Sequence, residues 1–193
     1  MKILVILFML ASCVPALAQE KLFDNRDGCF LLIRLKDGSL LESANLAQAK
    51  ERFSPCSTFK IAAALMAFES GAMTPETVFR WNGVREDREE CNQDQTPASW
   101  MERSVVWVTQ QITRQLGPAK VQKYLSVLKY GNQDFSGGVT QAWLTSSLKI
   151  SAQEQATLMG QLVRRKLPFS RQAQDQTVQI LVRPYLSRGH AGR

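Results

Sequence analysis

The segment between Ser54 and Gly71 constrains the fold more than any other part of the chain. Ser54 and Pro55 are typical of a helix start, and Gly71 is typical of a helix end. Between them, residues 61–68 are all apolar, so the helix has no polar face to turn toward water. The pattern therefore predicts a helix in the middle of the fold, covered on every side.

The remaining elements are predicted to be mostly helical. An apolar run at residues 30–35, a turn at 36–39 and Leu40-Leu41 predict a hairpin, and the charged, aperiodic residues 80–95 predict a surface loop. Helical spacing runs through 101–116 and 118–128, and Ser151 with Glu154 predicts a capping box before a further helix. A two-stranded hairpin cannot close a core, so this helical set needs further strands that the chain does not visibly supply.

The first eighteen residues have the pattern of a secretory signal. Lys2 is followed by an apolar stretch over residues 3–10 and by the small-residue cleavage pattern at 16–18. We therefore expect one domain over residues 19–193, periplasmic or secreted, with no membrane span, because no apolar run reaches eighteen residues. The alternative is a lipoprotein anchored at Cys13.

The net charge of +7 does not indicate nucleic-acid binding once it is placed along the chain. Residues 19–159 hold 16 Lys and Arg against 16 Asp and Glu, whereas residues 160–193 hold seven against one. The excess lies in the tail, and no basic stripe is interleaved with aromatic residues. We expect no nucleic-acid partner.

The cysteine and histidine content limits the chemistry. His190 is the single histidine and lies near the end, so neither a Ser-His-Asp triad nor a histidine-based metal site is expected. Cys29, Cys56 and Cys91 form an odd set whose pairing the spacing cannot choose. A hydrolase built on this sequence needs a general base other than histidine, without a metal.

The candidate nucleophile and base are Ser57 and Lys60, at the start of the predicted buried helix. Residues three apart share a helix face, and burial lowers the pKa of a lysine, as a lysine base requires. The S-x-x-K pattern also occurs at 126–129 and 146–149. Only the first is followed by an apolar run, which favours it over the reading of a capping serine with an exposed lysine.

Three further motifs follow along the chain. Ser104 precedes Val105 and Val106 at the start of an amphipathic helix, Tyr130-Gly131-Asn132 lies at a helix-to-loop turn, and Trp143 precedes a Ser-Ser-Leu-Lys-Ile-Ser stretch. Taken alone, each has an ordinary structural reading as a polar residue beside a core turn, a set of turn residues, or a core aromatic.

Together, these motifs resemble those of the class D serine β-lactamases, in the family's order, from about Cys29 to about Leu186. The resemblance implies an α+β fold, with a helical region packed on an antiparallel sheet. It also implies a serine hydrolase that opens the β-lactam ring of penicillins and gives antibiotic resistance.

The resemblance further assigns roles within the site. It implies an acyl-enzyme on Ser57, and Lys60 carboxylated by carbon dioxide as general base with no other cofactor. Ser104 is expected to pass a proton to the leaving nitrogen, and Trp143 to donate its indole N–H to the carbamate. The pocket is expected to be shaped by Tyr130, Asn132 and Val106.

The sequence departs from the family in one respect. The later Lys-Thr-Gly or Lys-Ser-Gly tripeptide is absent after Ile150, so we expect the C-terminal strands of the sheet to be missing from this chain. Two alternatives stay open: a β-lactam sensor or penicillin-binding domain that acylates without turnover, and an inactive truncated product. A homodimer is left open as well.

Overall fold

The computed structural model describes residue 23 and residues 27–188 of the 193. The predicted signal at 1–18, Cys13 and His190 lie outside these residues. The described elements, in chain order, are β1 (Phe30–Ile33), β2 (Leu40–Ala44), α2 (Leu46–Lys50), β3 (Arg52–Phe53), the 3-10 turn η1 (Cys56–Thr58), α3 (Phe59–Glu69), the 3-10 turn η2 (Glu89–Cys91), α4 (Pro97–Arg103), α5 (Val106–Leu116), α6 (Pro118–Leu128), β4 (Ile150–Ser151), α7 (Ala152–Val163) and α8 (Arg171–Arg188).

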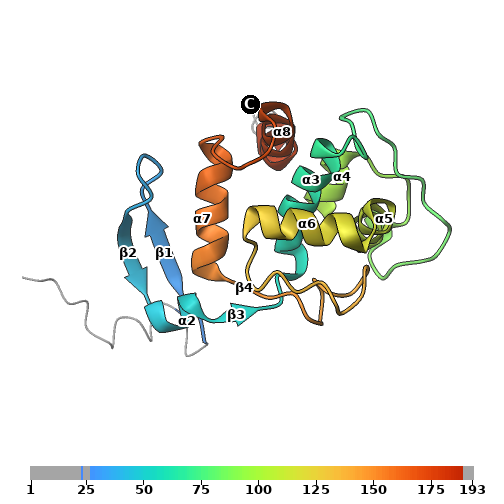
Figure 1. Cartoon of the computed structure of the whole chain (residues 1–193). Helices are drawn as coiled ribbons and strands as arrows, with labels where there is room; N and C mark the ends of the chain where they lie inside the picture. Colours follow the sequence, from blue (N-terminus) through green and yellow to red (C-terminus); the bar gives the residue numbers. More distant parts are fainter. Residues whose placement is uncertain (1–22, 24–26, 189–193) are drawn as a thin grey trace, which may run out of the picture.

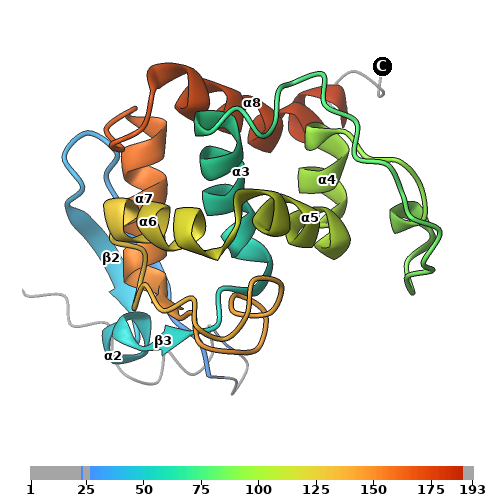
Figure 2. The same ribbon diagram turned by 45° about the vertical axis from the view of Figure 1, so that its right-hand side comes forward.

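Helix α3 lies at the centre of the helical part, as its apolar sequence predicts. Figures 1 and 2 show it between α8 and α5, with α6 crossing it. Residues 62–67 are completely buried. The helix ends at Glu69 with Ser70 as its C-cap, and Gly71 follows with a φ of 73° that glycine adopts without strain. The buried-helix prediction is confirmed.

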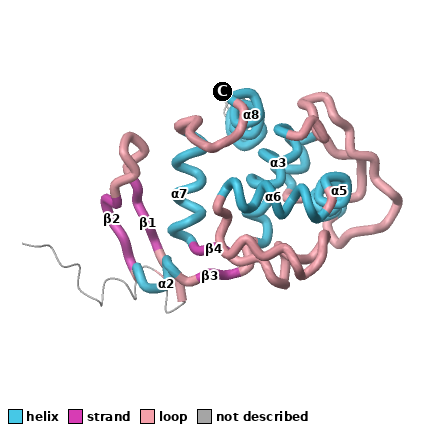
Figure 3. Tube along the Cα trace, viewed as in Figure 1, coloured by secondary structure: helices cyan, strands magenta, loops and turns pink. Residues whose placement is uncertain are grey.

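The described residues form an α+β fold with two small antiparallel sheets (Figure 3). The predicted hairpin is confirmed: β1 pairs with β2, and Phe30 lies opposite Ala44. The pairing of β3 with β4 was not predicted, because two residues per strand leave no alternating pattern to detect.

The capping box before α7 is also confirmed. The Ser151 hydroxyl accepts from the Glu154 N–H at 3.2 Å, and the Glu154 carboxylate accepts from the Ser151 N–H at 2.9 Å. Arg52 adds a two-pronged ion pair to the same carboxylate, with a shortest contact of 2.5 Å. Mainly because of this arginine, the pKa of Glu154 falls to about 2. The ion pair of Arg52 with Glu154 therefore connects β3 to the start of α7.

The helical spacing predicted over residues 101–116 is broken at Ser104. Helix α4 ends there because Ser104 adopts a left-handed conformation, with a φ of 56°, and α5 starts only after the extended Val105. A continuous helix through Met101 was therefore wrong, whereas a new helix beginning next to Ser104 is correct. Ser104 therefore lies in the turn between the two helices.

The Tyr130-Gly131-Asn132 turn fastens the loop that precedes β4. A Cβ on Gly131 would lie 1.9 Å from the Lys149 carbonyl oxygen, so only glycine fits. Asn132 donates its side-chain amide to the Ser147 carbonyl at 2.8 Å and accepts from the Lys149 N–H at 2.9 Å. These bonds close residues 132–149 into a compact loop.

Helix α8 covers α3 and α4 and was not predicted. Its first turns are polar, so no apolar pattern marks them as part of a buried helix. Gln174 in these turns is nevertheless 2% exposed, and its side chain bonds the backbone of both Leu167 and Phe169. No helix of the described part of the chain is long and apolar enough to cross a membrane.

Candidate active site

Ser57 lies exposed in η1, directly before the buried helix α3. The residue before it, Cys56, has a φ of 46°, and its N–H donates to the Trp143 carbonyl at 2.9 Å. The Cys56 thiol contacts the Leu144 carbonyl at 3.4 Å. The 132–149 loop therefore fixes the turn that presents Ser57.

A row of three side chains links Ser57 to Lys60. Lys60 Nζ donates to Ser104 Oγ at 2.7 Å, and Ser104 Oγ donates to Ser57 Oγ at 2.8 Å. Ser57 and Lys60 share one face of the first turns, as their spacing predicts, while Ser104 comes from the break between α4 and α5. The structure brings together the three residues predicted to be catalytic.

Lys60 is buried, with 1% of its surface exposed. Burial, with a smaller contribution from the charge of Arg88 and against an opposite effect of Cys56 and Cys91, lowers the pKa of its amine to about 8. From an ordinary value of 10.5, this raises the neutral fraction near pH 7.5 by more than about a hundredfold. Neutral amine, the form that accepts a proton or reacts with carbon dioxide, is therefore abundant.

Trp143 is fully buried against the start of α3. Its ring stacks on Phe59, with centroids 5.5 Å apart and an interplanar angle of 18°. Its Nε1–H has no acceptor among the described residues, although a buried indole N–H usually has one. The unpaired donor thus lies against Phe59, the residue before Lys60. It is the kind of partner that an anionic group added to Lys60 requires.

The three predicted pocket residues differ in position. Tyr130 is 1% exposed and packs edge-on against Phe59, with ring centroids 5.9 Å apart. Its hydroxyl donates to the Gln155 side-chain oxygen at 3.4 Å, and burial raises the pKa of the phenol. Asn132 is exposed, but its amide is engaged by the loop. Val106 is half-buried at the first position of α5. Contact of these residues with a substrate stays a prediction.

The other two S-x-x-K patterns lack the features of the first. Lys129 and Lys149 are exposed, and Ser126 donates back to the Gln122 carbonyl within its own helix. No hydroxyl–amine bond occurs at either place among the described residues. The choice of Ser57 and Lys60 therefore agrees with the geometry.

Arg88 was not among the predicted site residues, although its charge acts on Lys60 from the 80–95 loop. This loop is aperiodic and charged, so nothing in the sequence distinguishes Arg88 from its neighbours. The three cysteines of the described part, Cys29, Cys56 and Cys91, are free thiols. In the same part, no group of three His, Cys, Asp or Glu residues is placed to hold a metal ion.

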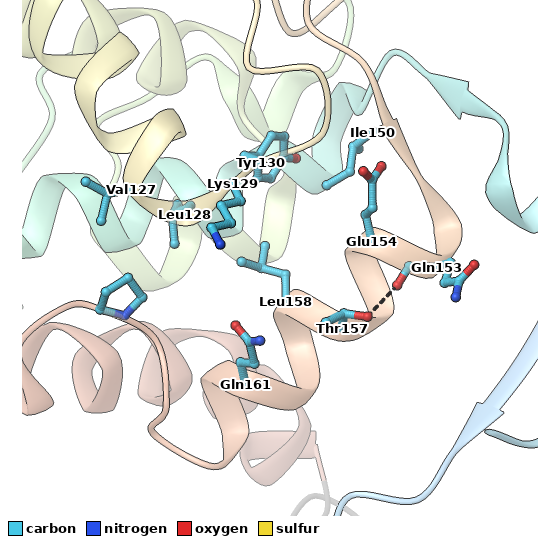
Figure 4. Close-up of a pocket in the computed structure, with 11 residues that line it drawn as sticks. Val127, Leu128, Lys129, Tyr130, Ile150, Gln153, Glu154, Thr157, Leu158 and Gln161 are labelled. Carbon is cyan, nitrogen blue, oxygen red and sulfur yellow. Dashed lines mark hydrogen bonds between the residues drawn. The ribbon is translucent and has the colours of Figure 1, made fainter. Parts of the chain in front are cut away.

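A cavity of about 460 Å³ lies elsewhere, between the end of α6 and α7 (Figure 4). Leu128, Ile150 and Leu158 are among its apolar residues, and Lys129 and Gln161 are among its polar ones. Ser57, Lys60 and Ser104 do not line it, so it is separate from the serine–lysine site.

Comparison with known proteins agrees with this geometry. Residues 15–191 match the family described as the penicillin binding protein transpeptidase domain. The chain is 40% identical over 175 residues to the OXA-1 β-lactamase of Escherichia coli, covering 88% of this chain and 63% of the relative. It is 40% identical over 151 residues to the probable β-lactamase YbxI of Bacillus subtilis, covering 77% of this chain and 56% of that protein.

Solved structures give the same result. The class D β-lactamase BAT-2 superposes with a TM-score of 0.80 at 36% identity, covering 84% of this chain and 68% of that one. The class D β-lactamase FUS-1 (OXA-85) of Fusobacterium nucleatum superposes with a TM-score of 0.79 at 30% identity, over 85% and 69% of the two chains. This chain thus spans about six tenths of the curated relatives and about two thirds of the solved ones. It belongs to the class D β-lactamase family, on the fold of the penicillin-binding transpeptidases.

Proposed function

We propose that this protein hydrolyses β-lactams of the penicillin type through an acyl-enzyme on Ser57, and thereby gives antibiotic resistance. The observation that carries the proposal is the hydrogen-bonded row from Lys60 through Ser104 to the exposed Ser57. An exposed hydroxyl connected to a buried amine whose pKa burial has lowered to about 8 is a nucleophile next to a base that is available in its neutral form. The names of the relatives support the substrate class.

In the acylation step, Ser57 Oγ bonds to the carbonyl carbon of the β-lactam and the ring C–N bond breaks. The Ser57 proton leaves along the row, because a neutral Lys60 amine accepts from Ser104 and Ser104 then accepts from Ser57. Ser104 then gives a proton to the ring nitrogen as that nitrogen leaves, and Lys60 returns its extra proton to Ser104, so that both are neutral again. The product is an ester of Ser57 with the opened ring.

Water then releases the ester. It attacks the ester carbonyl, loses a proton to the site and frees the Ser57 hydroxyl together with a carboxylic acid. When Lys60 is carboxylated, the added group supplies a base for this water. In the proposal Trp143 Nε1–H holds that group, since the donor is buried next to α3 and otherwise unpaired.

A second candidate function is a penicillin-binding or sensor domain that acylates and stops, which the transpeptidase family match allows. The unpaired Trp143 donor favours turnover, because acylation alone does not require a base on the water. We expect a burst of one acyl group per chain, followed by continued release of opened penicillin in buffer with bicarbonate. Mass spectrometry of the protein measures the acyl burst, and the absorbance of the substrate measures the continued release.

Other outcomes of this experiment separate the alternatives. A burst without release would support the sensor, and would contradict hydrolysis. No burst, together with a non-cooperative melting curve followed by circular dichroism, would support an inactive product. A homodimer also stays a prediction.

We also propose that the protein is exported, periplasmic or secreted, with a mature N-terminus at Gln19. The support is the charged, apolar and small-residue order of residues 1–18. N-terminal sequencing of the protein recovered from cells tests this. Palmitate incorporation at Cys13 would contradict it and indicate a lipid anchor instead.

A further inference from the structure

The turn between α4 and α5 places the Ser104 hydroxyl between its two partners. Ser104 Oγ lies 2.7 Å from Lys60 Nζ and 2.8 Å from Ser57 Oγ. Hydrogen bonds weaken steeply with distance and angle, so a small shift of the turn breaks at least one of the two. The turn has a φ of 56°, which a serine keeps only where its surroundings fix it. The row from lysine to serine therefore depends on the contacts that fix this turn.

The start of α5 is fixed by contacts with other elements. Its N-cap is Val105, whose side chain has no oxygen to accept a hydrogen bond from the first turn of the helix. Val105 is fully buried and anchors the turn in the core. Two residues later, Trp107 Nε1 donates to the Cys91 carbonyl at 3.0 Å. This bond connects the first turn of α5 to η2.

The turn η2 is itself connected to α4, the helix that ends at Ser104. Gln95, which is fully buried, donates its side-chain amide to the Glu90 carbonyl at 3.1 Å. The Gln95 side-chain oxygen accepts from Ser99 Oγ, in α4, at 2.8 Å. A series of hydrogen bonds therefore runs from α4 through Gln95 and η2 to Trp107 in α5, and bridges the break that carries Ser104.

A second contact holds the other side of the same turn. Arg88, the N-cap of η2, donates from its guanidinium to the Arg103 carbonyl, directly before Ser104. The 88–91 segment thus contacts the chain at residue 103 and at residue 107. Of these two contacts, only the one made by Trp107 reaches α5.

We propose that Trp107 is a positioning residue, whose indole N–H, bonded to η2, holds the Ser104 turn in the geometry in which the Ser104 hydroxyl reaches both of its partners. The effect is on proton transfer along the row, and hence on the acylation step, rather than on the affinity for the substrate. The relevance to acylation rests on the proposed function, whereas the support of the turn does not.

The experiment uses the full chain and two readouts. The first is hydrogen exchange of the Ser104 N–H, which donates to the Trp100 carbonyl and reports the opening of the turn without any substrate. The second is acylation by a penicillin at several concentrations, followed by mass spectrometry of the intact protein, which separates the limiting rate from the half-saturating concentration.

Trp107→Phe keeps an aromatic ring and deletes the donor. We expect the Ser104 N–H to exchange about twofold to tenfold faster, as loss of one hydrogen bond predicts. The limiting rate of acylation should fall about threefold to tenfold, while the half-saturating concentration stays within about twofold, because the reacting groups are misplaced but the binding contacts are kept.

Two controls separate this effect from general loosening. Trp81 Nε1 donates to the Val84 carbonyl at 2.9 Å, within the same 80–95 loop. Trp81→Phe deletes an equivalent indole bond that does not reach α5, so it should change neither readout. At the far end of α5, the Gly117 N–H donates to the backbone at 3.0 Å, and its exchange should stay unchanged in Trp107→Phe.

Three results in Trp107→Phe would overturn the proposal: unchanged exchange at Ser104, equal acceleration at Ser104 and Gly117, or an unchanged limiting rate of acylation. If this variant does not fold, Arg88→Ala replaces it for the exchange readout, because Arg88 is half-exposed and its bond supports the same turn. Unchanged exchange at Ser104 in Arg88→Ala would then overturn the proposal.

A wild type that is not acylated would overturn the proposed function instead. Exchange at Ser104 would still decide whether Trp107 supports the turn, so the two failures are distinguishable.

Discussion

Ser57→Ala is expected to abolish covalent labelling by a penicillin and to lower any turnover by at least about a thousandfold. The physical reason is that no other hydroxyl in the described part of the chain is both exposed and bonded into the row that ends at Lys60. Ser57 is exposed and ends that row, so its truncation should change the free energy of unfolding by less than about 1 kcal/mol. Mass spectrometry of the intact protein after exposure to a penicillin measures the adduct.

Matched controls come from the two other S-x-x-K patterns. Ser126→Ala and Ser146→Ala remove serines whose lysines are exposed, so labelling should remain stoichiometric. An adduct that persists in Ser57→Ala, and that peptide mapping places on Ser126 or Ser146, would show that the wrong serine was chosen.

The buried helix and the serine–lysine pair were predictable because their signals are local. Residues 61–68 are apolar on every face, and the relation of Ser57 to Lys60 follows from helix geometry alone. The capping box at Ser151 is likewise contained in four residues. These features require no knowledge of the rest of the fold.

Other parts of the site depend on contacts distant in sequence. The left-handed Ser104 leaves no mark in the sequence, because serine is not a residue that favours a positive φ. The turn at Cys56 is fixed by the Trp143 carbonyl, 87 residues later, and Arg88 acts through a loop without periodicity. Helix α8 was missed because its first turns are polar and its buried Gln174 bonds a neighbouring loop. Tertiary contacts set these features.

The indole N–H of Trp143 separates a structural aromatic from one that serves Lys60. Trp143→Phe keeps an aromatic ring against Phe59 and deletes a donor that has no acceptor among the described residues. Losing a hydrogen bond to a charged group costs roughly 1.5 to 3 kcal/mol, so carboxylated Lys60 should be held about tenfold to a hundredfold more weakly. Deacylation should slow and should partly recover when bicarbonate is added, as measured by substrate turnover at several bicarbonate concentrations.

Trp100 provides the matched control. It is also fully buried, but its Nε1 donates to Thr109 Oγ1 at 3.0 Å. Both substitutions lose the same ring volume, but only Trp100→Phe also loses a satisfied hydrogen bond and leaves Thr109 without its donor. In buffer free of carbon dioxide, Trp100→Phe should therefore lower the melting temperature more than Trp143→Phe, whose donor has no partner among the described residues. Turnover of Trp100→Phe should not depend on added bicarbonate beyond the wild-type dependence. If wild type and Trp143→Phe turn over equally in degassed and in bicarbonate-supplemented buffer, Trp143 is a core aromatic only, and the base that activates water has to be sought elsewhere in the site.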